Sequence, residues 1–446
     1  MMTRKSQWEG FMSTKRIGGN HDTTYDNGRT PFERDMDAIK FSSSFRNLEG
    51  KTQVFSLARN DYVRNRLTHS MEVATVGKNI AKIVGSRLIE KYSLNFSPYD
   101  FMAVIEAACL AHDIGHPPLA HAGEEAFREF FVNRKDSLGE LVGERYADFT
   151  NFEGNAHNIR ILTDLEQSSR KGGLRLTSAV LGAITKYPRF SHCKNGENFT
   201  FKAKKFNFFD CDAHILTEMA QNLGLTKADN GQEYFRSPLA YLVEAADDTC
   251  YAIVDIEDAY QMGVVSYEKA IELLMPLTNG DVPREDMDET DHIQRIRSKV
   301  IGRITIEIAD IFMEYEDDII DGNFEGDLLD KLSFSVDFKF LKEFASKFIY
   351  VSPVALEVRT AGYNIIDSLL SLLINASMDY LSNGSEASSK SHSYLAFIDN
   401  KKRKAIIEAE DLYGNLMAVT DYVASMSDNE AVRVYKNFLG ASIPTR

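Results

Sequence analysis

The segment around His112 constrains this chain most, because a helix must end there beside chemically active side chains. Apolar residues recur at helical spacing from 100 to 110. Gly115 and Pro117-Pro118 follow, and proline is poorly tolerated inside a helix. His112 and Asp113 are therefore predicted to lie at the end of a helix, where their side chains can face a neighbouring element.

Helical periodicity extends over most of the chain. Residues 69–90 and 239–260 carry apolar side chains at helical spacing. The same pattern returns in 300–313, 368–381 and 405–435. We therefore predict an all-α protein with at most a small β-hairpin, in which 69–90 and 100–112 form two helices that can pack antiparallel.

Two segments depart from the helical pattern. The first forty residues contain Gly18-Gly19, Asn27-Gly28 and Pro31 without apolar periodicity, which predicts an irregular arm wrapped onto the body. Asn195-Gly196 is a hairpin-turn dipeptide and predicts a short hairpin or lid. That lid is basic, since it carries Lys202, Lys204 and Lys205.

The composition excludes several classes of protein. The chain has 446 residues and a formal net charge of −15, which argues against a surface built wholly to grip nucleic acid. No stretch reaches the roughly 18–20 uninterrupted apolar residues of a membrane span, and the polar start lacks a signal peptide's apolar segment. The four cysteines are scattered. We expect a cytoplasmic protein with no membrane partner, in which an anionic substrate needs a metal or clustered Lys and Arg.

Four side chains have the chemistry of a divalent metal site. His69, His112 and Asp113 offer imidazole nitrogen and carboxylate oxygen, and such ligands leave positions open for water and a phosphate oxygen. A lone helical histidine is more often a core residue, but the adjacent His-Asp pair favours a ligand set. We choose Asp247 as the fourth ligand, because Ala245-Ala246 before it let its helix approach another closely.

The pattern of His69, His112-Asp113 and Asp247 resembles the ligand set of HD-domain phosphohydrolases, all-helical enzymes with a metal between helices. Further blocks along nearly the whole chain narrow the resemblance to the bacterial dGTP triphosphohydrolase family. These blocks are Arg29-Thr30, Lys51-Thr52-Gln53-Val54-Phe55, Arg66-Leu67-Thr68-His69-Ser70, 112–118, Gly154-Asn155-Ala156, Lys186-Tyr187-Pro188, 244–251 and 421–428. The chain departs from the family's pattern at Asn47, His157, Ser427 and Asn429, which bears on oligomer contacts and activator response more than on the chemistry.

The resemblance implies a reaction and an architecture. The reaction is metal-dependent hydrolysis of a deoxynucleoside triphosphate, with dGTP preferred, at the α-phosphorus, releasing the deoxynucleoside and tripolyphosphate. One Mg²⁺ or Mn²⁺ at the HD site and a homo-oligomer, tetramer or hexamer, are implied, and single-stranded DNA is conceivable as an effector through the lid lysines. We expect an N-terminal arm with a nucleotide-contacting segment (1–60), an HD catalytic core (61–265) and a C-terminal helical lobe (266–446).

His121 and Glu124 form a candidate acid–base dyad. Three residues apart on one helix, they share a face, so the carboxylate can hold one ring nitrogen and set the tautomer. An ordinary surface pair is the alternative, but the position beside the HD turn favours catalysis. Whether His121 activates water or protonates the leaving 5′-oxygen stays open. His116 is a secondary catalytic candidate that would assist with phosphate charge.

The resemblance also assigns substrate contacts. Gln53 and Val54 are expected near the sugar and base, and Lys186 and Tyr187 near phosphate and sugar. Tyr251 and Asp255 are expected against the deoxyribose. They follow Asp247 by one and two helical turns. A ring packed on C2′ leaves no room for a hydroxyl, and a carboxylate can accept from the 3′-hydroxyl.

Two further residues have open roles. Arg66 lies one helical turn before His69 and would either reach phosphate oxygens or form a structural salt bridge with an acidic neighbour. Glu357 is a candidate guanine reader, because a carboxylate can accept from guanine N1 and N2, which adenine does not reproduce.

Two other functions remain as alternatives. One is an HD phosphohydrolase that acts on another nucleotide phosphoester, against which the Gln53 and Lys186-Tyr187-Pro188 blocks weigh. The other is a nucleotide sensor or single-stranded nucleic-acid binder without turnover. That alternative predicts a lost metal ligand or a broken dyad, and this sequence has neither.

Overall fold

The computed structural model describes residues 3–19, 28–53, 63–193, 205–228, 231–280 and 287–441. Within these residues the chain is helical, and its β pairing is confined to isolated bridges. This confirms the predicted all-α class. The hairpin predicted at Asn195-Gly196, with Lys202 and Lys204, lies outside the described residues.

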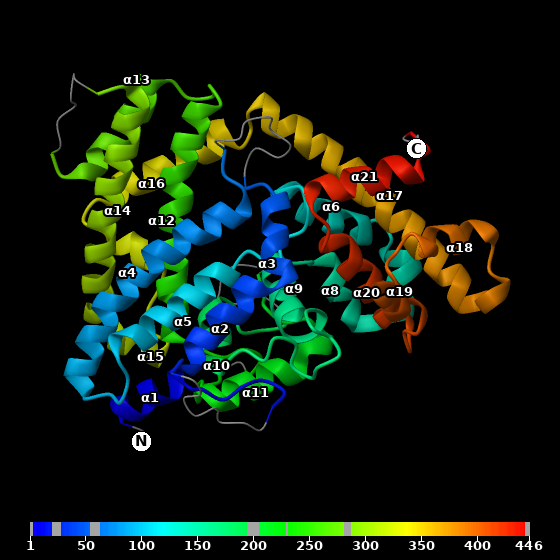
Figure 1. Cartoon of the computed structure of the whole chain (residues 1–446), viewed down its shortest axis with the longest axis horizontal. Helices are drawn as coiled ribbons and strands as arrows, with labels where there is room; N and C mark the ends of the chain where they lie inside the picture. The colour runs from blue at the N-terminus through cyan, green and yellow to red at the C-terminus, as the bar shows by residue number, and fades with distance from the viewer. Residues whose placement is uncertain are drawn as a thin grey trace.

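Three helices form the centre of the fold (Figure 1). They are α4 (Arg66–Tyr92), α5 (Pro98–Ala111) and α12 (Pro238–Gln261), close to the predicted ranges. Gly77 on α4 lets the three meet, because a Cβ there would lie 2.6 Å from Cys109 Sγ and 3.4 Å from Ala246 Cβ. The expected close approach of α12 through its alanines is therefore confirmed.

The start of the chain is helical, which corrects the predicted irregular arm. Both α1 (Arg4–Phe11) and α2 (Pro31–Phe41) pack on the body. Thr30 caps α2 in a reciprocal box with Glu33, and Pro31 occupies the first helical position. These are ordinary helix-start signals, so the prediction failed because Pro31 was read only as a breaker.

A first hydrophobic cluster surrounds α4, α5 and α12. It runs from Trp8 through Ile80, Ala108 and Leu242 to Ile349. Its other helices are α3 (Ser43–Asn47), α10 (Ser178–Ile184), α11 (Ala213–Leu223), α13 (Tyr267–Leu274), α14 (Glu289–Glu314), α15 (Glu316–Asp321) and α16 (Ser335–Phe344).

A second hydrophobic cluster joins the middle of the chain to its end. Phe127 and Phe149 pack with Leu370 and Leu416, and Figure 1 shows the long α17 crossing towards the C-terminal helices. Its helices are α6 (Ala120–Val132), α7 (Glu140–Val142), α8 (Ala147–Thr150), α17 (Pro353–Asn383), α18 (Ser389–Ala396), α19 (Asn400–Ile407), α20 (Leu412–Ala424) and α21 (Asp428–Phe438). Between the clusters, α9 (Gly154–Arg160) contributes Ala156 to the second and Ile159 to the first.

Short 3₁₀ and π turns link these helices. They are η1 (Leu48–Gly50), η2 (Lys135–Gly139), η3 (Gly143–Tyr146), η4 (Ile161–Leu165), η5 (Asp210–Asp212), η6 (Met275–Thr278), η7 (Leu328–Lys331), η8 (Ala345–Ile349) and η9 (Gly384–Glu386). The predicted domain boundaries at 60 and 265 stay a prediction, and the two clusters group the segments differently. Among the described residues, every helix falls short of the length and apolarity that crossing a lipid bilayer requires.

Candidate active site

Three side chains from three helices converge as a candidate metal site. His69 lies in the first turn of α4, His112 caps the end of α5, and Asp247 lies in the middle of α12. Asp247 Oδ1 is 3.2 Å from His69 Nε2 and 3.3 Å from His112 Nε2. One ligand atom from each residue lies within 4.8 Å of the others. Ligand atoms about 2.0–2.2 Å from a divalent ion have comparable mutual separations.

The surroundings of His112 suit a metal ligand. Its Nδ1 donates to Cys109 O at 2.6 Å, which leaves the Nε2 lone pair directed at the cluster. In the described part of the chain, Nε2 is buried without a well-formed hydrogen bond. A divalent ion would satisfy this orphaned atom, so the residues present fit the expected metal.

Asp113 lies beside this cluster and has Arg66, His116 and His112 as close neighbours. Its Oδ2 forms a salt bridge with Arg66 Nη1 at 2.8 Å, while Oδ1 lies 3.1 Å from His116 Nδ1 and 3.5 Å from His112 Nε2. Arg66 therefore forms the structural salt bridge that was one of its two predicted roles. The role of Asp113 as a metal ligand stays a prediction.

The carboxylates set the charge of the centre. Burial opposes a charge on the His112 ring, but Asp113 and Asp247 outweigh it and raise its pKa to about 9. Burial and the Arg66 guanidinium lower the pKa of His116 to about 3. The two shifts have opposite directions because His112 lies close to both carboxylates, whereas His116 lies near the Arg66 guanidinium.

Lys186 and Tyr187 follow the end of α10 and face the cluster. Lys186 Nζ lies 2.9 Å from Asp247 Oδ2. Burial disfavours its charge, but Asp247 and Glu244 hold the pKa of Lys186 above its usual value. Asn207, which was not predicted from the sequence, accepts from Tyr187 N at 2.7 Å and donates to Asn155 O at 3.2 Å. Asn207 therefore stabilises the turn formed by Lys186-Tyr187-Pro188.

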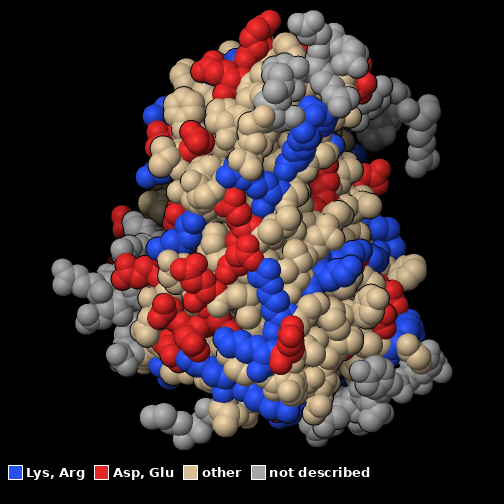
Figure 2. Space-filling view, turned by 90° about the vertical axis from the view of Figure 1, so that its left-hand side faces the viewer, with Lys and Arg blue, Asp and Glu red and all other residues tan. Residues whose placement is uncertain are grey.

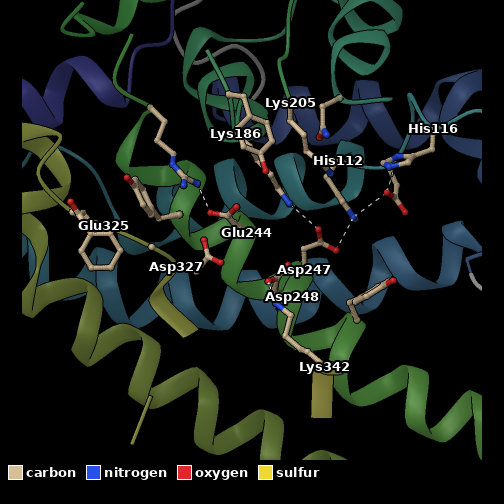
Figure 3. Close-up of a pocket in the computed structure, with 18 of the residues that line it drawn as sticks. His112, His116, Lys186, Lys205, Glu244, Asp247, Asp248, Glu325, Asp327 and Lys342 are labelled. Carbon is tan, nitrogen blue, oxygen red and sulfur yellow. Dashed lines mark hydrogen bonds and ion pairs between the residues drawn. The ribbon is translucent and has the colours of Figure 1, made fainter. Parts of the chain in front are cut away.

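His112, Asp113, His116, Lys186, Tyr187 and Asp247 line a cavity of about 1170 Å³. Figure 3 shows Lys186, Lys205 and Lys342 pointing into the same space as Asp247 and Asp248. Lys205 is the predicted lid lysine that lies within the described residues. A cavity lined by both basic and acidic side chains suits a polyanionic ligand that binds together with cations.

The candidate dyad lies at one end of this cavity, on α6. His121 lines the cavity, while Glu124 is buried and accepts from Gly154 N at 2.9 Å. Burial lowers the pKa of His121, and Glu124 opposes that shift. The dyad hydrogen bond itself stays a prediction. Leu119 and Ala120, which lead into α6, have left-handed backbone angles, with φ of 67° and 56°.

A second cavity of about 260 Å³ adjoins the first and shares Gln53, His121 and Tyr251 with it. Tyr350, which was not predicted, faces Tyr251 with ring centroids 5.5 Å apart. Its hydroxyl donates to Asp255 at 2.5 Å. Tyr251 and Asp255 share α12 as predicted, but Asp255 lines neither cavity.

Only some of the remaining predicted substrate contacts line the two cavities. Gln53 lines both cavities, and its Oε1 is buried without a hydrogen-bond partner among the described residues. Val54 lies outside the described residues. Glu357 is exposed on α17 and lines neither cavity. Glu125 and Arg359 line the smaller cavity instead and pair at 2.7 Å. Such a pair across two distant helices is invisible in the sequence.

Comparison with known proteins places this site in a family. The HD domain family matches residues 66–185, and the phosphohydrolase-associated domain family matches residues 334–437. A Synechocystis deoxyguanosinetriphosphate triphosphohydrolase-like protein is 35% identical over 98% of this chain and 100% of its own length. A Cronobacter sakazakii deoxyguanosinetriphosphate triphosphohydrolase is 30% identical over 76% of each chain. The chain belongs to the deoxyguanosinetriphosphate triphosphohydrolase family.

Membership of this family confirms the resemblance and makes the chain an HD phosphohydrolase. The HD match covers His69, His112-Asp113 and the α6 residues His121 and Glu124. Asp247 lies beyond the matched segment, so its place beside the histidines rests on the geometry of α12. The phosphohydrolase-associated match includes α20 and α21.

Proposed function

We propose that this chain hydrolyses dGTP at the α-phosphorus and releases deoxyguanosine and tripolyphosphate. The observation that carries the proposal is the position of the His-His-Asp cluster beside two adjoining cavities. The larger is lined by lysine and arginine together with the carboxylates that can hold cations, and the smaller is lined mainly by aromatic and apolar side chains. A triphosphate in the first and a nucleoside in the second would put the α-phosphorus between them, near His121.

The metal is proposed to be one Mg²⁺ or Mn²⁺ held by His69, His112, Asp113 and Asp247. When bound, it supplies Lewis-acid neutralisation of charge on an α-phosphate oxygen. Lys186, which keeps its proton beside Asp247, pairs with oxygens of the same phosphate. Positioning and charge neutralisation of this kind provide most of the catalysis in phosphoryl transfer.

His121 is the proposed acid–base group. Its ring borders both cavities, within reach of the attacking water and the 5′-oxygen. The α6 helix fixes its backbone, and Glu124 provides the carboxylate that can hold the ring. Burial lowers the pKa of His121 and Glu124 opposes that shift, a lowering that favours the neutral ring able to accept a proton. His116 would assist with phosphate charge from its place beside Asp113.

Sugar selection is assigned to Tyr251 and Gln53. The Tyr251 ring packs against Tyr350, whose hydroxyl is held by buried Asp255, so the ring has little freedom to move away from a 2′-hydroxyl. The orphaned Gln53 Oε1 can accept from the 3′-hydroxyl in the place first expected for Asp255. Both contacts favour a deoxyribose over a ribose.

Base reading is assigned to Glu125 and Arg359 in place of Glu357. An arginine can donate to guanine O6 and N7, and a carboxylate can accept from N1 and N2. The pair at the wall of the smaller cavity offers both functions. This assignment supports dGTP as the preferred substrate, because adenine presents the opposite pattern at N1 and position 6.

A homo-oligomer is part of the proposal. Apolar side chains on the outer side of α16 and the following segment are exposed, and they include Val336 at 80% and Phe340 at 55%. The others are Phe348, Val351 and Leu356. Large apolar side chains exposed on successive segments are typical of a protein interface, which supports self-association, proposed here as a tetramer or hexamer.

The face of the molecule drawn in Figure 2 has no continuous basic groove for single-stranded DNA among its described residues. Figure 2 shows basic and acidic side chains interleaved on one face of the molecule, whereas a single strand needs a continuous basic groove. Two of the lid lysines lie outside the described residues. The role of single-stranded DNA as an effector therefore stays a prediction. The cytoplasmic location is a separate prediction that also stays open to test.

Product analysis tests the proposed reaction. Purified protein is incubated with each of the four dNTPs and four NTPs in Mn²⁺ or Mg²⁺, and products are resolved by anion-exchange chromatography. The expected result is deoxyguanosine and tripolyphosphate, with dGTP turned over fastest. Release of a nucleoside monophosphate and pyrophosphate would contradict attack at the α-phosphorus with nucleoside as leaving group.

A further inference from the structure

The C-terminal helix α21 reaches the candidate active site through one carboxylate. Asp428, the first residue of α21, is buried to 3% exposure. Its Oδ1 accepts from Leu119 N at 2.8 Å, and its Oδ2 accepts from Thr52 N at 3.1 Å. The Thr52 hydroxyl also donates to Oδ2. A single side chain thus joins three segments that are far apart in the sequence.

The first of these contacts holds a strained turn. Leu119 and Ala120 are consecutive non-glycine residues with φ of 67° and 56°. Such conformations are strained for residues with a side chain and persist only where the surroundings enforce them. Leu119 is the N-cap of α6 but provides no side-chain cap. Asp428 accepts the Leu119 N–H directly, two residues before His121.

The second contact holds the segment that ends at Gln53. Thr52 precedes Gln53, and Lys51 Nζ donates to His116 O and, at 3.2 Å, to Ala424 O. The two elements meet so tightly that a Cβ on Gly50 would lie 2.7 Å from Ser427 Cβ. The corner between α20 and α21 is therefore continuous with the wall of both cavities.

We propose that Asp428 is a positioning residue, whose carboxylate locks the Leu119 turn to Thr52 and so fixes His121 and Gln53 relative to each other. This inference rests on the proposed function, in which His121 and Gln53 serve dGTP hydrolysis. It gives the C-terminal helices a specific task in the reaction. These helices fix the positions of the acid–base group His121 and the sugar contact Gln53 without touching the substrate.

Asp428→Asn tests the inference with a side chain of nearly the same shape. An amide cannot accept at both ends, so one N–H donor loses its partner and the turn loosens. Hydrogen–deuterium exchange is expected to rise by about tenfold in peptides covering 115–125 and 47–53. With dGTP, kcat should fall by about tenfold or more, while Mn²⁺ affinity stays unchanged, because His69, His112 and Asp247 lie on other helices.

Glu430→Gln is the matched control. Glu430 also lies in the first turn of α21 and carries the same charge, but it contacts neither Leu119 nor Thr52 among the described residues. Exchange and kcat are expected to match the wild type. Equal loss of kcat in both variants would overturn the inference, since a general effect on α21 would then explain it.

Thr52→Val covers the case in which Asp428→Asn does not fold. It removes the hydroxyl contact and leaves the Leu119 contact, so KM for dGTP should rise about fivefold with kcat nearly unchanged. An unchanged KM and unchanged exchange in 47–53 would overturn the inference. A wild type that releases no nucleoside from any dNTP, with Asp428→Asn still exchanging faster, would defeat the proposed function and leave the positioning role standing.

Discussion

Lys186 Nζ pairs with one oxygen of Asp247 at 2.9 Å, while the other oxygen of the same carboxylate faces His69 and His112. Asp247 thus links the candidate metal site to the cation expected to bind phosphate. Removing the Asp247 carboxylate should therefore break the connection between metal binding and the position of Lys186.

Asp247→Asn is expected to abolish Mn²⁺ binding and to lower dGTP turnover by about a thousandfold, because one charged ligand of the ion is lost. Isothermal titration with Mn²⁺ and the product assay check it. Asp248→Asn is the control, since Asp248 pairs with Lys342 at 2.7 Å on the cavity wall and should leave Mn²⁺ affinity intact. Equal Mn²⁺ binding by Asp247→Asn and wild type would refute the ligand assignment.

His121→Gln should lower kcat by about 10²–10⁴, the usual contribution of acid–base catalysis, without changing Mn²⁺ affinity. Glu124→Gln should lower it less, because the ring stays in place but loses its partner. Single-turnover kinetics at saturating dGTP provide the measurement. Glu129→Gln, an exposed change on the same helix, should behave as wild type. Full activity in His121→Gln would remove the dyad from the mechanism.

Glu125→Gln should reduce the preference for dGTP over dATP by about tenfold, because the amide offers guanine N1 and N2 a weaker and mismatched partner. The ratio of kcat/KM for the two nucleotides measures it. Glu357→Gln, on the exposed side of α17, serves as the comparison. If only Glu357→Gln relaxed the preference, the guanine reader would be the residue first predicted from the sequence.

Asp212 should make stability depend on pH. Burial raises its pKa to about 7, although Arg160, 3.3 Å away, opposes the shift. The folded state therefore holds this proton more tightly than the unfolded chain. The resulting stabilisation is complete below about pH 4 and is lost as pH rises to about 7.

Asp212→Asn should flatten this dependence, with an upper bound of about 4 kcal/mol at about 1.4 kcal/mol per pKa unit. Urea unfolding between pH 5 and 9 measures it. Asp164→Asn is the control, because Asp164 pairs with the same Arg160 at 3.5 Å but is 57% exposed. A wild-type free energy of unfolding that does not fall between pH 5 and 8 would contradict the raised pKa.

Phe340→Glu should weaken self-association, because it places a charge in the exposed apolar surface of α16. Light scattering across micromolar concentrations should show the mass falling towards one chain. Phe41→Glu, at a residue 79% exposed on α2, is the matched control and should keep the assembly. A monomeric wild type would rule out the proposed oligomer.

The helices that carry the candidate metal ligands were predictable because their signals are local. Periodicity located α4, α5 and α12, and the His112-Asp113 pair before Gly115 and the prolines located the helix end. The N-terminal helices were missed although Thr30 and Glu33 form a readable capping box. That error came from weighing Pro31 as a breaker where it is the first residue of a helix.

The second layer of the site was not predictable, because its partners lie far apart in the chain. Tyr350 reaches Asp255 across 95 positions and Asp428 reaches Thr52 across 376. No periodicity or spacing relates such residues. The resemblance and the helical spacing from Asp247 assigned Asp255 to the sugar, and neither could reveal that the fold gives this carboxylate a tyrosine hydroxyl as partner.

The two hydrophobic clusters divide the reaction's groups between them. The histidine and aspartate ligands belong to helices of the first, while α6 carries His121 within the second. Under the proposed mechanism neither half alone holds both the metal ligands and the acid–base group, so turnover requires the interface between the two clusters. A small shift between the two clusters, even with every helix intact, would separate these groups and abolish turnover. Core substitutions at this interface should therefore reduce activity before they prevent folding.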